Sequence, residues 1–186
     1  MAINVKLLLV NAMLSLSTEK PVQKITIADI IQRSGTSRQT FYNHFMDKND
    51  LICYIFLKTL KGERTIIENE GYYAYLVNLH KEAQKYSDFI KQACKITGQN
   101  SLRELLYKQN YKYYRNLIVE HYGEEALTDE IDYALQYNAY GDSNMYINWA
   151  LAGMPGTPEK QASLVYSCFP DCIKEILPVN PKKSQL

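Results

Sequence analysis

Residues 37–48 hold a dense run of side chains that can donate hydrogen bonds to a nucleic acid. The run reads SRQTFYNHFMDK. Arginine matches the edge of guanine and glutamine matches the edge of adenine in the major groove, so we expect Arg38 and Gln39 to read bases. Thr40 and Asn43 are second choices for the same role. The chemistry that this run offers is therefore recognition of double-stranded DNA.

Hydroxyl, imidazole and ammonium groups near the same run are suited to phosphate oxygens. Such contacts fix the register of a protein on DNA without reading sequence. The backbone N–H groups at a helix N-terminus can add to them. The residues for which we expect this positioning role are Thr26, Ser37, Tyr42, His44 and Lys48.

Two short helices joined by a tight turn must position these side chains. Thr26 with Asp29 at the third helical position forms a capping box, and Gly35 can take the left-handed conformation that ends a helix. Ser37 is placed to cap the second helix, which carries Phe41 and Phe45 on its apolar side. Asp47, with Asp50 three residues later, is placed to cap a third helix. This order is that of a DNA-binding helix-turn-helix.

The motif resembles the signature of the TetR family of transcriptional regulators. The matching run is Ile25-Thr26-x-x-Asp29-Ile30, Ser34-Gly35-x-Ser37-x-x-Thr40-Phe41-Tyr42-x-His44-Phe45-x-x-Lys48-x-x-Leu51. Ser34 and Thr36 depart from it, because the family usually has alanine and an aliphatic residue there. The match covers about the first third of the chain. The resemblance implies a homodimer that binds an operator through this motif and an effector through a helical body.

Charge is divided unevenly along the 186 residues. Residues 1–61 contain eight Lys and Arg against four Asp and Glu, and the remainder contains 13 against 16. Residues 1–61 are therefore net basic and the rest of the chain is net acidic, which indicates a polyanionic partner for residues 1–61 alone.

The opening apolar run predicts a helix of the DNA-binding domain, not a signal peptide. Val5, Leu9, Met13 and Leu16 fall on one helical stripe, and Asn11, Ser15 and Ser17 interrupt the run. No stretch approaches the roughly 20 apolar residues that cross a bilayer. The four cysteines include no CxxC pair. We therefore expect a cytoplasmic protein that contacts no membrane.

The rest of the chain shows helical periodicity and no strand pattern. We expect helices over residues 51–67, 72–96, 101–122 and 125–152, and a last helix capped by Thr157 and split near Phe169 by Pro170. The sequence thus predicts an all-α protein. Residues 1–50 would form a three-helix helix-turn-helix DNA-binding domain, and residues 51–186 a helical effector-binding and dimerisation domain.

Aromatic residues mark a candidate ligand site in this second domain. The chain has 16 tyrosines and one tryptophan. Pockets combine aromatic walls with a few polar groups, although an ordinary aromatic core would explain the same residues. Our candidates for binding an apolar or aromatic effector are Tyr107, Tyr111, Tyr114, Tyr146 and Trp149.

Wide apolar faces near the carboxy terminus are candidates for a dimer surface, where the resemblance also places one. The residues are Leu127, Ile131, Leu135, Met145, Tyr146, Trp149, Val165, Tyr166, Phe169, Ile173 and Leu177. The alternative is that these faces close the core of a single chain.

An enzyme is not expected, because His44, His80 and His121 are far apart and lack a nucleophile or metal-ligand partner at a useful spacing. No metal or cofactor is expected either. The function that we predict is a ligand-responsive repressor. One alternative is an activator whose body binds a partner protein, since Trp149, Gly153 and the Thr-Pro helix start resemble the branch that activates dihydroxyacetone kinase operons. The other is a helical interaction module without DNA binding.

Overall fold

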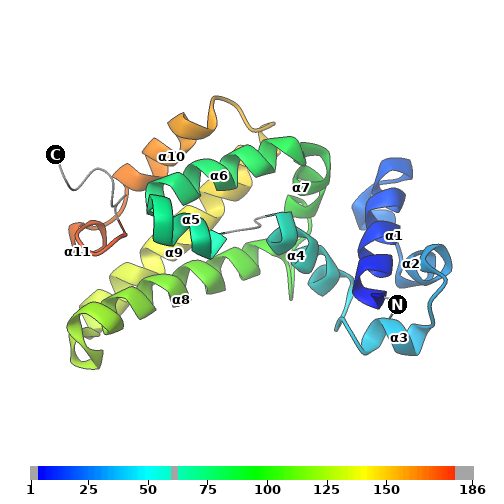
Figure 1. The fold of residues 1–186 in the computed structure, drawn as a ribbon, viewed down its shortest axis with the longest axis horizontal. Helices are drawn as coiled ribbons and strands as arrows, with labels where there is room; N and C mark the ends of the chain where they lie inside the picture. Colours follow the sequence, from blue (N-terminus) through cyan, green and yellow to red (C-terminus); the bar gives the residue numbers. More distant parts are fainter. Residues whose placement is uncertain (1–3, 60–62, 179–186) are drawn as a thin grey trace.

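The computed structural model describes residues 4–59 and 63–178, which form eleven α-helices and two 3-10 helices with no strand among them. Figure 1 shows α1, α2 and α3 together at one end of an elongated molecule, with the other helices extending away from them. We call residues 4–50 the head and residues 51–178 the body. The predicted fold class is confirmed.

The head is built from α1 (Val5–Glu19), a 3-10 turn η1 (Val22–Lys24), α2 (Ile27–Ser34) and α3 (Arg38–Tyr42). Leu9, Met13 and Leu16 of the predicted α1 stripe are buried. The capping box at Thr26 forms as expected, and Gly35 ends α2 at φ 66° in the left-handed region.

Ion pairs hold α1 on α2. Arg33 makes a two-pronged contact to the Glu19 carboxylate, with both N···O distances at 2.7 Å, and Lys20 lies 2.7 Å from Asp29. Two parallel N–H···O bonds fix orientation better than a single contact. These pairs set the angle at which α2 presents the turn that leads to α3.

The helix α4 (Lys48–Thr59) leads from the head into the body, where α5 (Glu63–Glu70) packs against α6 (Tyr72–Lys85). The single helix expected over residues 51–67 is therefore two elements, and residues 60–62 lie outside the described residues. The boundary predicted at residue 50 falls inside α4. Thus one helix belongs partly to the head and partly to the body.

The single helix expected over residues 72–96 is also two, α6 and α7 (Ser87–Cys94). The chain leaves the helical region at Tyr86, where φ is −108° and ψ is 30°. After this break α7 packs against the head, and the Gln92 side-chain oxygen accepts the Val22 N–H at 2.7 Å. Tertiary packing overrides helical periodicity at this point.

The remaining elements are α8 (Leu102–Tyr122), η2 (Glu124–Ala126), α9 (Asp129–Leu151), α10 (Pro158–Ser167) and α11 (Asp171–Lys174). Thr157 caps α10 as predicted, Ser101 caps α8, and Pro170 separates α10 from α11. The helix expected from residue 125 instead begins after its N-cap Thr128, because the preceding residues form η2.

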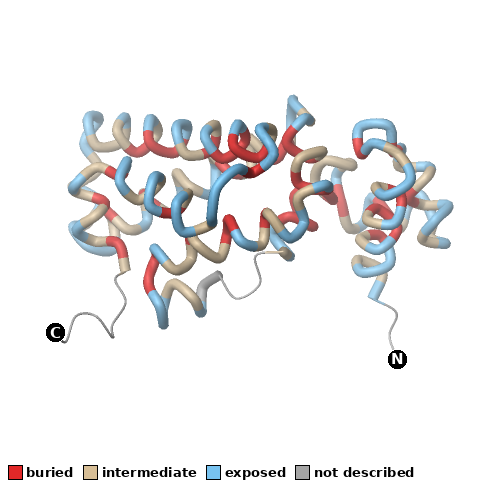
Figure 2. Tube along the Cα trace, turned by 90° about the horizontal axis from the view of Figure 1, so that it is seen from above, coloured by how far each residue is buried: buried red, intermediate tan, exposed pale blue. Residues whose placement is uncertain are grey.

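Two separate apolar cores lie along the molecule. The first, which we call the proximal core, joins Leu9 and Phe41 of the head to Phe56 of α4 and continues to Tyr146 and Trp149 of α9. The second, the distal core, contains residues of α6, α8, α9, α10 and α11, including Tyr114 and Leu135. Figure 2 shows buried segments both in the head and in the adjoining part of the body. The head and the near half of the body therefore share one core.

The distal core accounts for several residues that the sequence suggested for a dimer surface. Leu135, Phe169, Ile173 and Leu177 are each no more than 3% exposed within the single chain. These four residues pack inside a single chain, so they are not available for the dimer contact that the sequence suggested. For them the alternative, a closed core within one chain, holds.

Candidate nucleic-acid interface and ligand site

Four of the predicted DNA-contacting side chains lie exposed on one surface of α3. Phe41 is fully buried and anchors the helix to the head, so Arg38, Gln39, Tyr42 and Asn43 point to solvent. Arg38 lies 5.6 Å from the centroid of the Tyr42 ring, and the Gln39 amide donates to Asn43 Oδ1 at 2.9 Å. Contacts between residues four apart hold these side chains next to one another.

The other predicted contacts on the motif are tied to its caps. The Thr26 hydroxyl accepts the Asp29 N–H at 3.2 Å, and the Ser37 hydroxyl accepts the Thr40 N–H at 3.0 Å. Thr40 and His44 are half-buried beside the exposed surface. These groups shape the ends of α2 and α3 around the four exposed side chains.

Lys48 is engaged inside the head. Its ammonium donates to the carbonyl oxygens of Val22, Gln23 and Ile25, at 3.1, 3.0 and 2.9 Å. Burial lowers the pKa of Lys48. All three ammonium donors are therefore used, and this side chain can reach a phosphate only by releasing those carbonyls.

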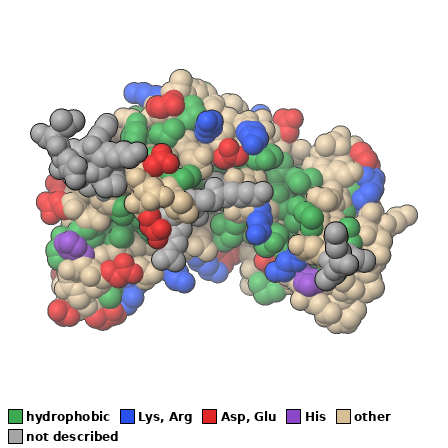
Figure 3. All heavy atoms as spheres, in the orientation of Figure 1, with side chains coloured by type: hydrophobic (Ala, Val, Ile, Leu, Met, Phe, Trp, Pro, Cys, Tyr) green, Lys and Arg blue, Asp and Glu red, His purple; other side chains and the backbone are tan. Residues whose placement is uncertain are grey.

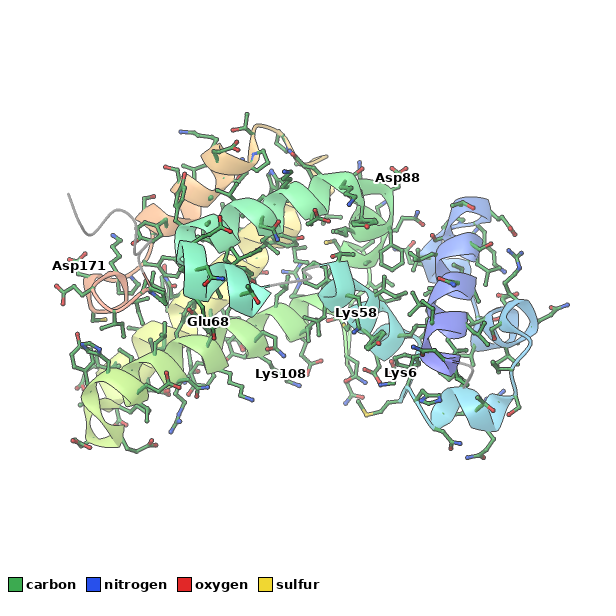
Figure 4. All side chains as sticks on the ribbon, in the orientation of Figure 1. Lys6, Lys58, Glu68, Asp88, Lys108 and Asp171 are labelled. Atoms are coloured by element: carbon green, nitrogen blue, oxygen red, sulfur yellow. The ribbon has the colours of Figure 1, made fainter. Side chains whose placement is uncertain are left out.

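Further basic groups lie where the head meets α4. The ammonium groups of Lys6 and Lys58 lie 5.2 and 5.4 Å from the Tyr54 ring centroid, and Figure 4 labels these two lysines at the start of α1 and on α4. On the face shown in Figure 3, acidic side chains gather instead at the far end of the body. This separation of charge would favour a polyanion at the head.

The structure divides the five candidate ligand-binding aromatics among different places. Tyr107 stacks on Tyr140 with ring centroids 4.0 Å apart, and Tyr111 donates to the Asp132 carboxylate. Tyr114 is buried in the distal core. Of the five, Tyr146 and Trp149 line one cavity in the body, Tyr114 lines a smaller cavity beside it, and Tyr107 and Tyr111 are placed apart from both.

This cavity, about 420 Å³ in volume, lies between α6, α9 and α10, and we call it the seam pocket because it lies where the two cores meet. Its lining consists of His80, Tyr137, Asn138, Gly141, Asp142, Met145, Tyr146, Asn148, Trp149, Ala152, Gln161, Leu164, Val165 and Cys168. A smaller cavity of about 40 Å³ shares His80, Asp142 and Tyr146 with it. The volume is in the range of small-molecule sites.

Two rings at the seam pocket are held by defined hydrogen bonds. His80 is 2% exposed, its Nδ1 lies 2.7 Å from the Leu76 carbonyl oxygen, and burial lowers its pKa. The Trp149 indole N–H donates to the Pro155 carbonyl at 2.9 Å. The imidazole and indole rings meet edge to face, with centroids 4.8 Å apart. His80 is thus a buried residue whose ring is fixed by the groups around it.

Two polar residues of this pocket, Asp142 and Asn138, were not among the candidates that the sequence suggested. Asp142 accepts a hydrogen bond from the Tyr114 hydroxyl at 2.5 Å, and burial raises the pKa of its carboxyl group to about 6. Asn138 donates to the Cys168 carbonyl at 3.2 Å. The spacing of Asn138, Asp142, Met145 and Trp149 places all four on one face of a helix, and this was the signal that could have found them.

Residues 4–59 and 63–178 contain neither a candidate metal cluster nor a candidate membrane-spanning helix. Within these ranges, no group of three or more His, Cys, Asp or Glu side chains could hold a metal ion. No helix there combines the length and apolar character that crossing a bilayer requires.

Comparisons with known proteins agree with this architecture. Residues 9–55 match the family described as "Bacterial regulatory proteins, tetR family". Residues 70–170 match a TetR carboxy-terminal family described as "Transcriptional regulator C-terminal region". No curated protein sequence gives a match.

Two solved structures are similar to the whole chain. The dihydroxyacetone kinase operon activator DhaS aligns with a TM-score of 0.60 at 20% identity, over 95% of this chain and 99% of that one. The TetR family repressor AlkX from Dietzia sp. strain DQ12-45-1b, implicated in biodegradation of n-alkanes, aligns with a TM-score of 0.51 at 17% identity, over 94% of this chain and 99% of that one. At these identities the likeness establishes a shared fold.

Proposed function

Because the chain belongs to the TetR family of bacterial regulatory proteins and is a DNA-binding, non-enzymatic transcriptional regulator, we propose that it acts as a ligand-responsive repressor. In this proposal a homodimer binds a palindromic operator through α3 of each chain. An effector in the body then weakens that binding.

The observation that carries the proposal is the exposed α3 surface. On this surface Arg38 contacts Tyr42 and Gln39 contacts Asn43, and all four side chains are exposed. Arginine and glutamine can each make two hydrogen bonds to a purine edge, which gives the base discrimination that an operator requires. Tyr42, His44 and the caps at Thr26 and Ser37 lie around them and would position the helix on phosphates.

An apolar face on α9 and α10 supports the homodimer. Its side chains are between 47% and 74% exposed in the single chain, and they are Tyr133, Tyr137, Tyr140, Met145 and Leu164. Such a patch on one side of a chain suits a two-fold interface, in which the same surface of each copy meets the other. The dimer face that we propose is therefore carried by residues largely different from those first suggested by the sequence.

A direct packing route connects the seam pocket to the head. Tyr146 lines the pocket and meets Phe56 of α4 edge to face, with ring centroids 6.0 Å apart. Phe56 belongs to the same core as Phe41, which anchors α3. A ligand that moved Tyr146 would therefore act on the helix that joins body and head. A coupling of about 1–3 kcal/mol between sites is usual for such linkage.

Selection of duplexes from a random pool, followed by sedimentation of the protein with the selected duplex, tests the proposal. We expect a site with two-fold symmetry and two chains on each duplex. An asymmetric site occupied by one chain would contradict the homodimer, and absence of any preferred sequence would contradict operator recognition.

A second candidate is an activator whose body binds another protein. The exposed α9–α10 face favours it as well, since the same patch could receive a different chain. The similarity of fold to the dihydroxyacetone kinase operon activator is compatible with this candidate. Sedimentation of the protein alone separates the two, because a monomer with its apolar face free would favour a different partner.

A further inference from the structure

Asp142 is a partly buried carboxylate with no lysine or arginine in its described surroundings. It contributes to the lining of both cavities at the junction of the cores, and the described lining of neither contains lysine or arginine. The Tyr114 hydroxyl is its hydrogen-bond donor among the described residues. An ionised carboxylate removed from water costs free energy unless a charge or several donors compensate it.

Two neutral acceptors in the same pocket also lack donors. Asn138 and Tyr146 are 9% and 7% exposed, and neither Asn138 Oδ1 nor the Tyr146 hydroxyl oxygen has a hydrogen-bond partner among the described residues. Buried polar atoms are nearly always paired, so unpaired ones call for an explanation. Both oxygens are buried behind the pocket surface, so the polar group that we assign to a ligand is the Asp142 carboxylate.

The walls around these acceptors are apolar and aromatic. Tyr137, Tyr146 and Trp149 supply rings, and Met145, Leu164 and Val165 supply aliphatic surface. Aromatic faces attract cations, and tryptophan does so most strongly. Tyr137, Met145 and Leu164 also belong to the proposed dimer face, so a second copy of the chain would close over the pocket.

We propose that the seam pocket binds an organic cation, in which a primary ammonium faces Asp142 while an attached apolar or aromatic group fills the space beside Trp149. An ammonium has three N–H donors and no acceptor, which matches a carboxylate that accepts a single hydrogen bond from the described residues. An anion would be repelled by Asp142, and a neutral molecule would leave the carboxylate uncompensated. The inference rests on the proposed effector role and names the chemical class of that effector.

Three probes of one shape test the charge preference in the full-length chain. Phenethylammonium, propylbenzene and 3-phenylpropionate are cationic, neutral and anionic versions of the same phenylalkyl group. Fluorescence of Trp149, the single tryptophan, reports binding at the pocket wall. We expect the cation to bind about 10- to 100-fold more tightly than propylbenzene and the anion to bind most weakly. Equal affinity for cation and neutral probe would overturn the inference.

Replacement of Asp142 identifies the group responsible. Asp142→Asn should remove the preference for the cation while propylbenzene still binds, which also shows that the pocket is intact. Asp132→Asn is the matched control, because Asp132 lies on the same helix but bonds to Tyr111 and Gln136 outside the pocket. Persistence of the cation preference in Asp142→Asn would overturn the assignment.

The wild-type protein provides a second measurement should Asp142→Asn fail to fold. The titratable groups that line the two cavities with Asp142 are Tyr72, Tyr75 and His80 on α6, Tyr114 on α8, Tyr137 and Tyr146 on α9, and Cys168 at the end of α10. With the carboxyl pKa at about 6, cation affinity should fall about tenfold between pH 8 and pH 5 while propylbenzene affinity stays constant. A cation affinity that does not change over this range would overturn the role of Asp142.

The effector role is tested separately from the pocket. If phenethylammonium binds with the expected preference but leaves affinity for the selected duplex unchanged, the cation site is supported and the effector function is contradicted. If no charge preference is found, the cation site is contradicted, whereas duplex binding by the head, measured without probe, remains as evidence for the regulator.

Discussion

Polar side chains are satisfied differently in the head and in the body. In the head, Thr26 and Ser37 bond to backbone N–H groups three residues away, and Lys48 caps three carbonyls of the adjoining turn. In the body, the Asp142 carboxylate, which contributes to the pocket lining, has one described donor, and the buried oxygens Asn138 Oδ1 and Tyr146 Oη have no hydrogen-bond partner among the described residues. These polar groups of the head find hydrogen-bond partners within the chain, whereas the carboxylate of the seam pocket has room for a further donor.

This difference explains how one chain can both hold a fixed recognition surface and respond to a ligand. A capped and ion-paired head keeps Arg38 and Gln39 in place. The Asp142 carboxylate in the pocket is partly removed from water, which costs free energy that a suitable ligand would recover. Ligand binding therefore has free energy available to displace Tyr146 relative to Phe56 of α4. Each prediction below tests one side of this contrast.

The largest effect is expected at the proposed dimer face. Leu164→Glu places a charge where Leu164, 47% exposed in the single chain, would be covered by a second copy. An unpaired buried charge costs several kcal/mol, so we expect dimer affinity to fall by at least about 100-fold. Sedimentation equilibrium measures the change.

The control for this substitution is Leu7→Glu. Leu7 is 53% exposed on α1, at the opposite end of the molecule from α10. The Leu7→Glu substitution should leave the affinity of the dimer unchanged. If both substitutions, or neither, dissociated the dimer, the assignment of the interface to α9 and α10 would be wrong.

Arg38→Ala should reduce discrimination at one base position in each half-site. Loss of a two-pronged base contact costs about 1–3 kcal/mol on the preferred duplex and much less on random DNA. Tyr42→Phe should instead weaken all sequences alike, because it removes a phosphate contact. Competition binding with single-base variants measures both. An equal loss on preferred and random DNA would show that Arg38 does not read a base.

Lys48→Ala distinguishes an internal role from a DNA contact. The three carbonyl contacts of Lys48 predict a loss of about 1–3 kcal/mol in the free energy of unfolding, measured by urea denaturation. The phosphate contact suggested by the sequence predicts instead that the salt dependence of DNA binding becomes shallower by about one unit. Lys24, exposed on η1, provides the control substitution Lys24→Ala.

Asp142→Asn should stabilise the protein while disabling its pocket. Because the carboxyl pKa is raised from 3.8 to about 6 on folding, the folded chain holds the proton more tightly, and stability falls as pH rises from about 4 to about 6. The amide avoids this penalty. We expect the variant to gain about 1–2 kcal/mol at pH 8, allowing for partial exposure of the group, and less at pH 5. A loss of stability at pH 8 would indicate that the ionised carboxylate is already compensated.

The head was predictable from sequence because its contacts are local. Caps at Thr26, Ser37 and Gly35 depend on residues within three or four positions, and the structure has them where expected. The break at Tyr86 was not predictable in this way, since α7 turns to reach Val22, 70 positions away from Gln92 in the chain. The sequence grouped Tyr107 and Tyr111 with Trp149, and the structure places them apart, because periodicity gives the face of a helix but not its neighbour across the fold.

The most direct test of the whole account is a linkage measurement between pocket and operator. Affinity for the selected duplex is measured with and without saturating phenethylammonium, and affinity for phenethylammonium with and without duplex. We expect duplex and phenethylammonium each to lower the protein's affinity for the other by the same factor, between about 5- and 150-fold. We also expect Asp142→Asn to abolish the effect of the cation. Independent binding of the two ligands to the wild-type protein would contradict the account.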